Sequence, residues 1–286
     1  MTRCREIAFD DLDAVADLLA RGFVGRSRDY WMAGLRRQAA RSVPEGYPRF
    51  GYLLDHDRAP VGVLLLITTD RGGDAPEIRC NLSSWYVEPA FRNYAPMLTK
   101  IAQRLKQVTY VNISPARWTW PIIEAQGFRA YCNGLFFSLP LLSRAGTDAR
   151  VEIVPADVTE IAGLPAAEAE LLIRHARYGC LSLVVRAARG AVPFVLQPMR
   201  IRRGFLAPPA MQMVYCRDIA DYVACAGIIS RVLLGRGKLS VILDANGPVP
   251  GLRGIYTERR GRKYVKGPVQ PRLGDLSDTE LVIYGP

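Results

Sequence analysis

The stretch WYVEPAFRNYAPML, residues 85–98, carries the residue pattern with the clearest chemical meaning in this chain. An apolar run ending at Val87 predicts a strand, Pro89 predicts a tight connection, and a helix is predicted to open near Tyr94. The free N–H groups at the start of a helix attract anions, phosphates in particular. The sequence therefore predicts an anion site at this turn, where Arg92 could add a charge-assisted contact.

This turn resembles the pyrophosphate-binding turn of the GCN5-related N-acetyltransferase (GNAT) superfamily, a valine-ended strand followed by x-P-x-x-R-x-x-G-x-G and a helix. Val87, Pro89 and Arg92 match, whereas Ala95 and Met97 stand where the family's two glycines usually sit. Those glycines let the backbone approach the ligand. A Met97 side chain that points outward would occupy the coenzyme's place, and one that points inward would leave the N–H groups free. An ordinary strand–turn–helix without a ligand is the alternative.

The resemblance implies acetyl-CoA or another acyl-CoA as the donor substrate. The coenzyme-binding residues are then expected to be Trp85, Tyr86, Val87, Arg92, Asn93, Tyr94, Ala95, Pro96, Met97 and Leu98. In the family, the strand that precedes the turn bulges, so that its backbone pairs with pantetheine and orients the thioester. The corresponding segment here is RCNLSSWYV, residues 79–87, in which Asn81, Ser83 and Ser84 are polar among apolar neighbours.

The next helix also resembles the family's, because it ends in the matching Gly127-Phe128. Gly127 is predicted to end that helix in the left-handed conformation. Many members place a tyrosine four residues before the glycine, to protonate the departing thiolate. Ile123 stands there and has no proton to give, so another group or a water must supply it. Tyr110, Ser114 and Trp118 are substitutes by location only.

Two further residues are candidates for the general base. Glu88 lies beside the turn and could act through a water, although a carboxylate on a turn is more often merely solvated. His175 titrates in the useful range, although RHARYG also reads as a plain helix end where a cation favours the dipole. Glu88, Tyr110 and His175 are therefore the catalytic candidates.

Periodic apolar residues predict the elements that position these groups. Helices are expected over 10–23 and 27–40, with Ser27 as the N-cap of the second. In the resembled family they wall the acceptor pocket, so Tyr30 and Trp31 are candidate acceptor contacts or core aromatics. Two strands over 50–70 form a hairpin, and GLFFSLPLL, residues 134–142, is expected to complete an antiparallel pair with the strand that starts at Phe128.

The second half of the chain repeats the first. The offset is 211 − 82 = 129 from Leu82 to Met211 and 243 − 111 = 132 from Val111 to Leu243. Between its first strand and its hairpin, the second copy is shorter by about the length of one helix. We therefore predict an α/β (α+β) protein of two tandem GNAT-like domains, each a mixed, mostly antiparallel sheet flanked by helices. The boundaries expected are 1–143 for the domain with the acyl-CoA site, 144–150 for the linker and 151–286 for a degenerate second domain.

The equivalent turn of the second copy reads YCRDIADYVACAG. Asp218 and Asp221 stand near the expected pyrophosphate position, and like charge disfavours a diphosphate there, so the second copy is not expected to bind the coenzyme. Further on, Pro248 and Pro250 argue against a helix. The basic run at 258–266 is expected to form a hairpin, and LVIY, residues 281–284, a final strand.

Composition excludes several classes of protein. No apolar run approaches the ~20 residues of a membrane span, and no signal region is evident, so a cytoplasmic location is expected. The 6 cysteines form no C-x-x-C pair and lie apart from the 2 histidines, which argues against a metal site and a disulfide framework. The net charge of +11 favours an anionic partner. Dense basic runs lie at 199–203 and 258–266.

These observations favour acyl transfer from acetyl-CoA or another acyl-CoA to an amine of a small molecule or peptide. One alternative is a GNAT-fold binding protein that has lost catalysis, motivated by Ala95, Met97 and Ile123. Another is an aminoacyl-tRNA-dependent transferase of the tandem type, for which tRNA or another polyanion would be the partner. The acceptor, the acyl length and the oligomeric state stay open.

Overall fold

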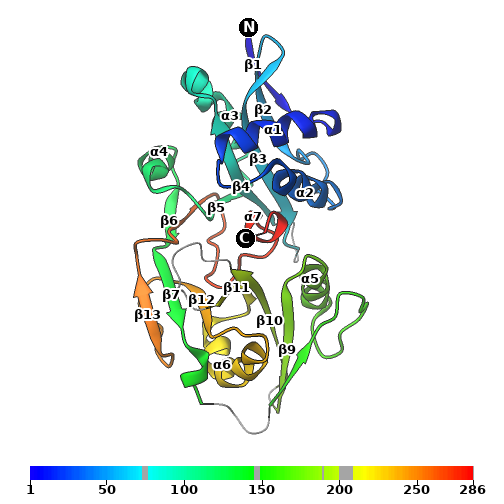
Figure 1. The fold of residues 1–286 in the computed structure, drawn as a ribbon, viewed down its shortest axis with the longest axis vertical. Coiled ribbons are helices and arrows are strands. Elements are labelled where there is room, and N and C mark those ends of the chain that lie inside the picture. The colour runs from blue at the N-terminus through cyan, green and yellow to red at the C-terminus, as the bar shows by residue number, and fades with distance from the viewer. Residues whose placement is uncertain (73–76, 145–148, 189, 200–208, 286) are drawn as a thin grey trace. The chain divides into compact units, whose positions relative to one another are not determined.

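The computed structural model describes residues 1–72, 77–144, 149–188, 190–199 and 209–285. The chain forms two compact units. Unit 1 consists of Met1–Arg129, Tyr264–Gln270 and Asp278–Gly285, and unit 2 of Ala130–Lys263 and Pro271–Ser277 (Figure 1). Most of the predicted linker and of the basic run at 199–203 lies outside the described residues. Within those residues, no helix has the length and apolar character that crossing a membrane requires.

Unit 1 is built on sheet A, a mixed seven-stranded sheet with the order β1-β2-β3-β4-β5-β14-β6. β4 and β5 are parallel, and the β1–β2, β2–β3, β3–β4 and β5–β14 pairs are antiparallel. The strands are β1 (Thr2–Glu6), β2 (Gly51–His56), β3 (Ala59–Asp70), β4 (Ile78–Val87), β5 (Thr109–Asn112), β14 (Lys263–Lys266) and β6 (Arg129–Cys132).

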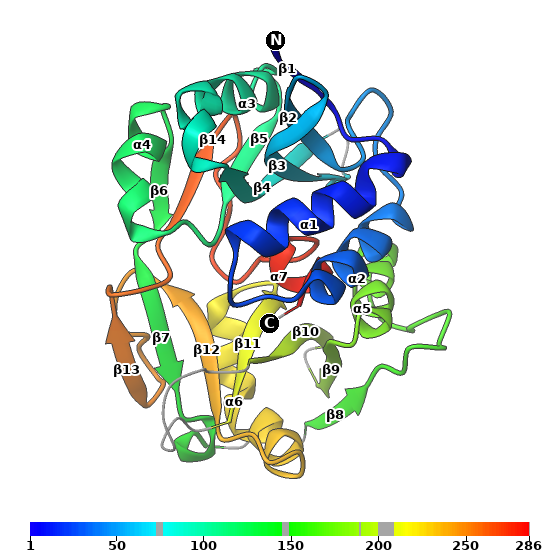
Figure 2. The same ribbon diagram turned by 45° about the horizontal axis from the view of Figure 1, so that its top comes forward.

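Helices cover both faces of sheet A (Figure 2). α1 (Leu12–Gly22) and α2 (Arg28–Ala39) lie on one face, and α3 (Ala95–Ala102) and α4 (Trp120–Ala125) on the other. β3 is buried on both sides, since Leu64 and Leu66 pack in the α3–α4 core while the alternating Leu65 and Ile67 are also buried. Ser27 caps α2 as predicted, because its hydroxyl accepts the N–H of Tyr30 at 3.2 Å.

Unit 2 is built on sheet B, also seven-stranded, with the order β13-β7-β12-β11-β10-β9-β8. β11 and β12 are its parallel pair. The strands are β13 (Gly254–Thr257), β7 (Gly134–Ser138), β12 (Ser240–Ala245), β11 (Ala210–Cys216), β10 (Gly190–Met199), β9 (Leu181–Ala187) and β8 (Arg150–Ile153), and the main helices are α5 (Ala166–Arg177) and α6 (Ile219–Leu234). Two mixed sheets flanked by helices confirm the predicted fold class.

The repeat in the sequence corresponds to a repeat in strand pairing. In sheet A, Arg79 pairs with Thr109, and in sheet B, Ala210 pairs with Ser240. The offsets are 210 − 79 = 131 and 240 − 109 = 131, so both strands of the parallel pair repeat after the same number of residues. This offset is close to the values of 129 and 132 obtained from the sequence. Between the first strand and the hairpin, sheet B has α5 alone where sheet A has α1 and α2. The predicted loss of one helix is confirmed.

The prediction that the strand from Phe128 pairs with GLFFSLPLL is wrong. β6 lies beside β14 in sheet A, whereas β7 pairs with β12 and β13 in sheet B. Only Asn133 separates β6 from β7, which is shorter than the two-residue minimum of a hairpin loop. The chain runs on from one sheet into the other, and Gly134 is needed there because a Cβ would lie 2.3 Å from the Thr257 carbonyl oxygen.

Two predictions about the end of the chain are also wrong. The basic run at 258–266 is no hairpin, because β13 belongs to sheet B and β14 to sheet A. The final LVIY is not a strand, because Glu280–Ile283 form the short helix α7. Each copy of the repeat therefore supplies one strand, β7 or β14, to the sheet built mainly by the other. Pro248 and Pro250 lie outside any helix, as predicted.

Substitution of Gly34 by alanine tests the packing of α7 on α2. In a helix interior alanine is ordinarily more stable than glycine by about 1 kcal/mol. At Gly34, however, a Cβ would lie 2.0 Å from the buried Tyr284 ring. We expect Gly34→Ala to lower the free energy of unfolding by about 1 to 3 kcal/mol, measured by urea denaturation. In a Tyr284→Ala background the same change should be stabilising, and destabilisation there would show that the ring is not the cause.

Candidate functional site

The most distinctive feature of unit 1 is the point where β4 and β5 part, which we call the fork. The two strands pair from Arg79–Thr109 to Asn81–Val111, and β4 then continues alone beside β3 to Val87. The β3–β4 register shifts between Val63 and Leu65, and Ser84 has a φ of 52°. β4 is therefore bulged, as the resemblance implied, and parted backbone groups of this kind can pair with an amide-bearing ligand.

The Asn81 side chain sits at the fork. Its Nδ2 donates to the carbonyl oxygens of Leu82 (3.1 Å) and Val111 (3.3 Å), one on each strand. Its Oδ1 accepts the backbone N–H of Glu280 at 2.7 Å. The buried amide thus satisfies backbone groups that the strands no longer satisfy for each other.

The turn after β4 has the predicted strand end and helix start, with an unpredicted 3₁₀ helix between them. β4 ends at Val87 as expected, but a 3₁₀ helix over Pro89–Tyr94 precedes α3, which begins at Ala95. The Ala95 N–H donates to the Arg92 carbonyl, and Pro96 has no N–H. Two of the first backbone donors of α3 are therefore unavailable to an anion, which leaves a larger share of any phosphate contact to side chains.

The side chains of this turn face the surface. Arg92, Asn93, Tyr94, Pro96 and Met97 are exposed, whereas Val87 and Leu98 are buried and Ala95 is partly buried against the core. Met97 is 39% exposed, so its side chain lies on the outside of α3, where a ligand would approach. The Arg92 guanidinium has no hydrogen bond or ion pair within the described residues and is available to an anion.

Trp85 and Tyr86 point to opposite faces of sheet A. Trp85 packs against the core under α3 and α4, and its indole N–H is buried with no hydrogen-bond partner within the described residues. Tyr86 lies against α1, where its ring occupies the space that a Cβ on Gly22 would need. An unpaired indole N–H beside the fork can donate to a ligand carbonyl.

The catalytic candidates have separate surroundings, and one of them belongs to the other unit. Glu88 forms an ion pair with Arg21 at 2.9 Å. Tyr110 is buried on the α3 face, and its hydroxyl accepts the Leu105 N–H at 3.2 Å. His175 belongs to the other unit, where it is fully buried and its Nδ1 lies 2.8 Å from the Leu171 carbonyl oxygen. Because a carbonyl only accepts, that Nδ1 carries the proton.

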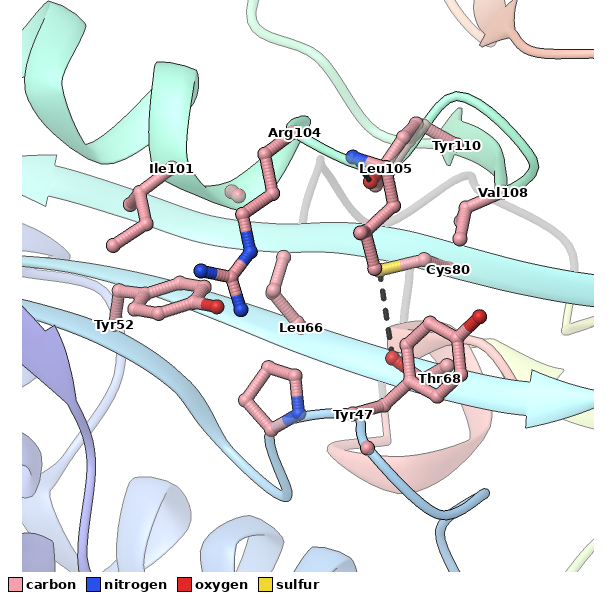
Figure 3. Close-up of a pocket in the computed structure, with 13 residues that line it drawn as sticks. Tyr47, Tyr52, Leu66, Thr68, Cys80, Ile101, Arg104, Leu105, Val108 and Tyr110 are labelled. Atoms are coloured by element: carbon pink, nitrogen blue, oxygen red, sulfur yellow. Dashed lines mark hydrogen bonds between the residues drawn. The ribbon is translucent and has the colours of Figure 1, made fainter.

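Tyr110 lines a small cavity between α3 and sheet A, together with Tyr52, Thr68, Cys80 and Arg104 (Figure 3). Its volume of about 10 Å³ is at the lower limit for one water molecule. The Thr68 hydroxyl lies 3.6 Å from the Cys80 sulfur, and burial raises the pKa of that thiol to about 12. Apart from the exposed Arg104, these lining groups are buried in the core, and the cavity has no room for a substrate.

The helix after β5 matches the prediction in its ending. Gly127 has a φ of 85°, in the left-handed region. Ile123 is buried in the α3–α4 core, so no proton donor stands at this position. Of the other two substitute acids, Trp118 is exposed. Ser114 is exposed as well, and its hydroxyl donates to the Glu280 carboxylate. Glu280 was missed by the sequence analysis, since nothing in its local pattern connects it with β4.

The equivalent turn of unit 2 is already occupied by an acid. Asp218 is the N-cap of α6, and its Oδ1 accepts the Ala220 N–H at 2.7 Å. This carboxylate takes a donor that a phosphate would use. Among all the described residues, no three His, Cys, Asp or Glu side chains lie close enough together to hold a metal ion.

No protein-family model and no curated protein matches the sequence. Solved structures do resemble the chain. A putative acetyltransferase from Pyrococcus horikoshii has a TM-score of 0.57 at 12% identity, covering 97% of this chain and 93% of that one. A GCN5-related N-acetyltransferase from Anabaena variabilis has a TM-score of 0.58 at 11% identity, covering 93% and 72%. A probable N-acyltransferase from Enterococcus faecalis has a TM-score of 0.55 at 12% identity, covering 97% of this chain and 74% of that one.

Likeness at such low identity shows the fold. The chain therefore has the GNAT fold, in two tandem domains that together span nearly the whole length of the Pyrococcus structure. This confirms the family resemblance at the level of architecture.

The titration of Tyr110 gives a test of its environment. Burial raises the pKa of its phenol to about 12, above the ~10 of an unfolded chain. The folded protein keeps this proton where the unfolded chain loses it, so the stabilisation is complete below pH ~10 and is lost as the pH rises toward ~12. We expect Tyr110→Phe to unfold with a shallower decline in stability over that range, measured by urea denaturation. Tyr94→Phe, at an exposed position, is the control and should leave the slope unchanged.

Proposed function

We propose that this chain is an acyltransferase that moves an acyl group from acetyl-CoA or another acyl-CoA to an amine of a small molecule or peptide. The observation that supports it most is the fork of unit 1, where β4 bulges and parts from β5. The fold likeness to acetyltransferases adds to it. The reaction needs a thioester held beside a deprotonated amine and a stabilised oxyanion.

The fork suits the pantetheine arm of the donor. That arm carries two amides in a thin, flexible chain, and β4 beyond Leu82 has backbone groups on its β5 side that no longer meet β5. The indole N–H of Trp85 adds a donor on the α3 face. In this arrangement, backbone N–H groups of residues 85–87 lie beside the thioester carbonyl and serve the oxyanion.

The pyrophosphate is assigned to the turn over residues 92–98, where the outward-pointing side chain of Met97, which has three rotatable bonds, has to turn aside to admit it. Arg92 supplies a free guanidinium there, and the exposed start of α3 supplies the favourable end of the helix dipole. Because Pro96 and Ala95 offer no free N–H, the affinity depends on Arg92 more than it would in a glycine-rich turn. Binding is assigned to unit 1 alone, since Asp218 stands at the equivalent place in unit 2.

Substitution of Arg92 tests this assignment. We expect Arg92→Ala to weaken acetyl-CoA binding by about 1 to 3 kcal/mol, the loss of a charged hydrogen bond, measured by isothermal titration calorimetry. Arg36→Ala is the matched control, since Arg36 is equally exposed on α2 and the change removes the same charge. An equal loss in both variants, or none in either, would place the coenzyme elsewhere. Tight binding without turnover on any amine would instead indicate a protein that binds coenzyme and does no chemistry.

A further inference from the structure

The segment Asp278–Gly285 is part of unit 1 although it comes last in the chain. Tyr284 is buried, and its hydroxyl donates to Gln38 Oε1 at 2.6 Å. Arg37 on α2 donates to the carbonyl oxygens of Ile283 and Tyr284 at 2.5 and 3.0 Å. These contacts fix the segment on the α1–α2 face of sheet A, where the family resemblance leads us to expect the acceptor pocket.

Within this segment, hydrogen bonds of both the backbone and the side chain hold Glu280 at the fork. Its backbone N–H donates to Asn81 Oδ1 at 2.7 Å, and Asn81 in turn bridges Leu82 on β4 and Val111 on β5. Its carboxylate accepts the hydroxyl of Ser114, two residues beyond the end of β5. The carboxylate is therefore fixed beside β5 where the strands part, at a place that solvent reaches.

The other acid–base candidates lie elsewhere. Tyr110 is buried on the α3 face, Glu88 is paired with Arg21 beyond the end of β4, and His175 is in unit 2. On the α1–α2 side, Tyr30 lies close enough to Glu280 for the carboxylate to help burial raise the pKa of its phenol. Glu280 is thus the titratable group, of those considered above, that hydrogen bonds place at the fork itself.

We propose that Glu280 is the general base for the acceptor amine, an inference that rests on the proposed function. The Glu280 carboxylate takes a proton from the acceptor ammonium. The amine nitrogen then forms a bond to the thioester carbon, and the C–S bond breaks with its electron pair on sulfur. The second nitrogen proton passes to water as the amide forms, and the coenzyme thiolate takes a proton from water, so that no net proton stays on the protein once Glu280 has released its own to solvent. An anionic base on an exposed rim selects for a cationic primary amine.

The test compares Glu280→Gln with the wild-type chain. Glutamine keeps the backbone N–H and an acceptor for Ser114 but cannot take the proton. The probe is whichever of n-hexylamine, benzylamine, spermidine and a lysine tripeptide the wild type acetylates fastest, with thiol release as the readout. We expect kcat to fall on the order of 100-fold or more, with unchanged acetyl-CoA affinity and thermal stability. Glu280→Asp should recover at least tenfold over Glu280→Gln.

The control is Glu45→Gln, at an exposed position of unit 1, which should match the wild type. Turnover of Glu280→Gln within threefold of wild type would overturn the inference while leaving the proposed function in place. A loss shared equally by Glu280→Asp, or accompanied by weaker acetyl-CoA binding, would assign Glu280 a structural role and overturn it as well. Failure of the wild type to bind acetyl-CoA, or to acetylate any of the amines, would refute the proposed function and the inference with it.

Discussion

The site in unit 1 depends on how backbone polar groups are satisfied where β4 and β5 part. Two parallel strands that stop pairing leave N–H and C=O groups that need other partners when buried. Asn81 meets part of that need by donating to a carbonyl on each strand. Gln212 stands at the equivalent register in unit 2, since 212 − 81 = 131, and donates to the Met213 carbonyl. Both copies thus keep a buried amide at the point of divergence.

The exchange of β7 and β14 makes the two halves of the sequence interdependent. Sheet A has β14 between β5 and β6, and sheet B has β7 between β12 and β13. Without β14, β5 would become an exposed edge strand of sheet A, and without β7, β12 would become an exposed edge strand of sheet B. Lys263, at the start of β14, is buried beside Asp244 at 2.8 Å. Removing one partner of such a pair is strongly destabilising, so the crossover is fixed by charge as well as by strand pairing.

Local features were predictable from sequence and long-range pairings were not. The Ser27 cap, the left-handed Gly127 and the end of β4 at Val87 each follow from a few neighbouring residues. The choice of sheet for β7 does not, because its alternation fits either sheet, and Asn133-Gly134 imitates a hairpin turn. LVIY has strand-like composition, but the chain forms the short helix α7 there, and Tyr284, at the C-cap of that helix, is buried against Gly34. Glu280 lies 199 residues from Asn81 in sequence, beyond any spacing rule.

Both units contain a point where the parallel strands part, but only the following turn of unit 1 suits an anionic ligand. The two turns differ in the charges of their side chains. In unit 1 the turn after the bulged strand has a free guanidinium at Arg92 and no carboxylate bound to the helix start. In unit 2, Asp218 caps α6 with its own carboxylate, which already supplies the negative charge that the helix end favours. A diphosphate there would have to displace the Asp218 carboxylate from the Ala220 N–H and would then lie beside its negative charge. The same architecture therefore presents a free guanidinium at this turn in one copy and a carboxylate in the other.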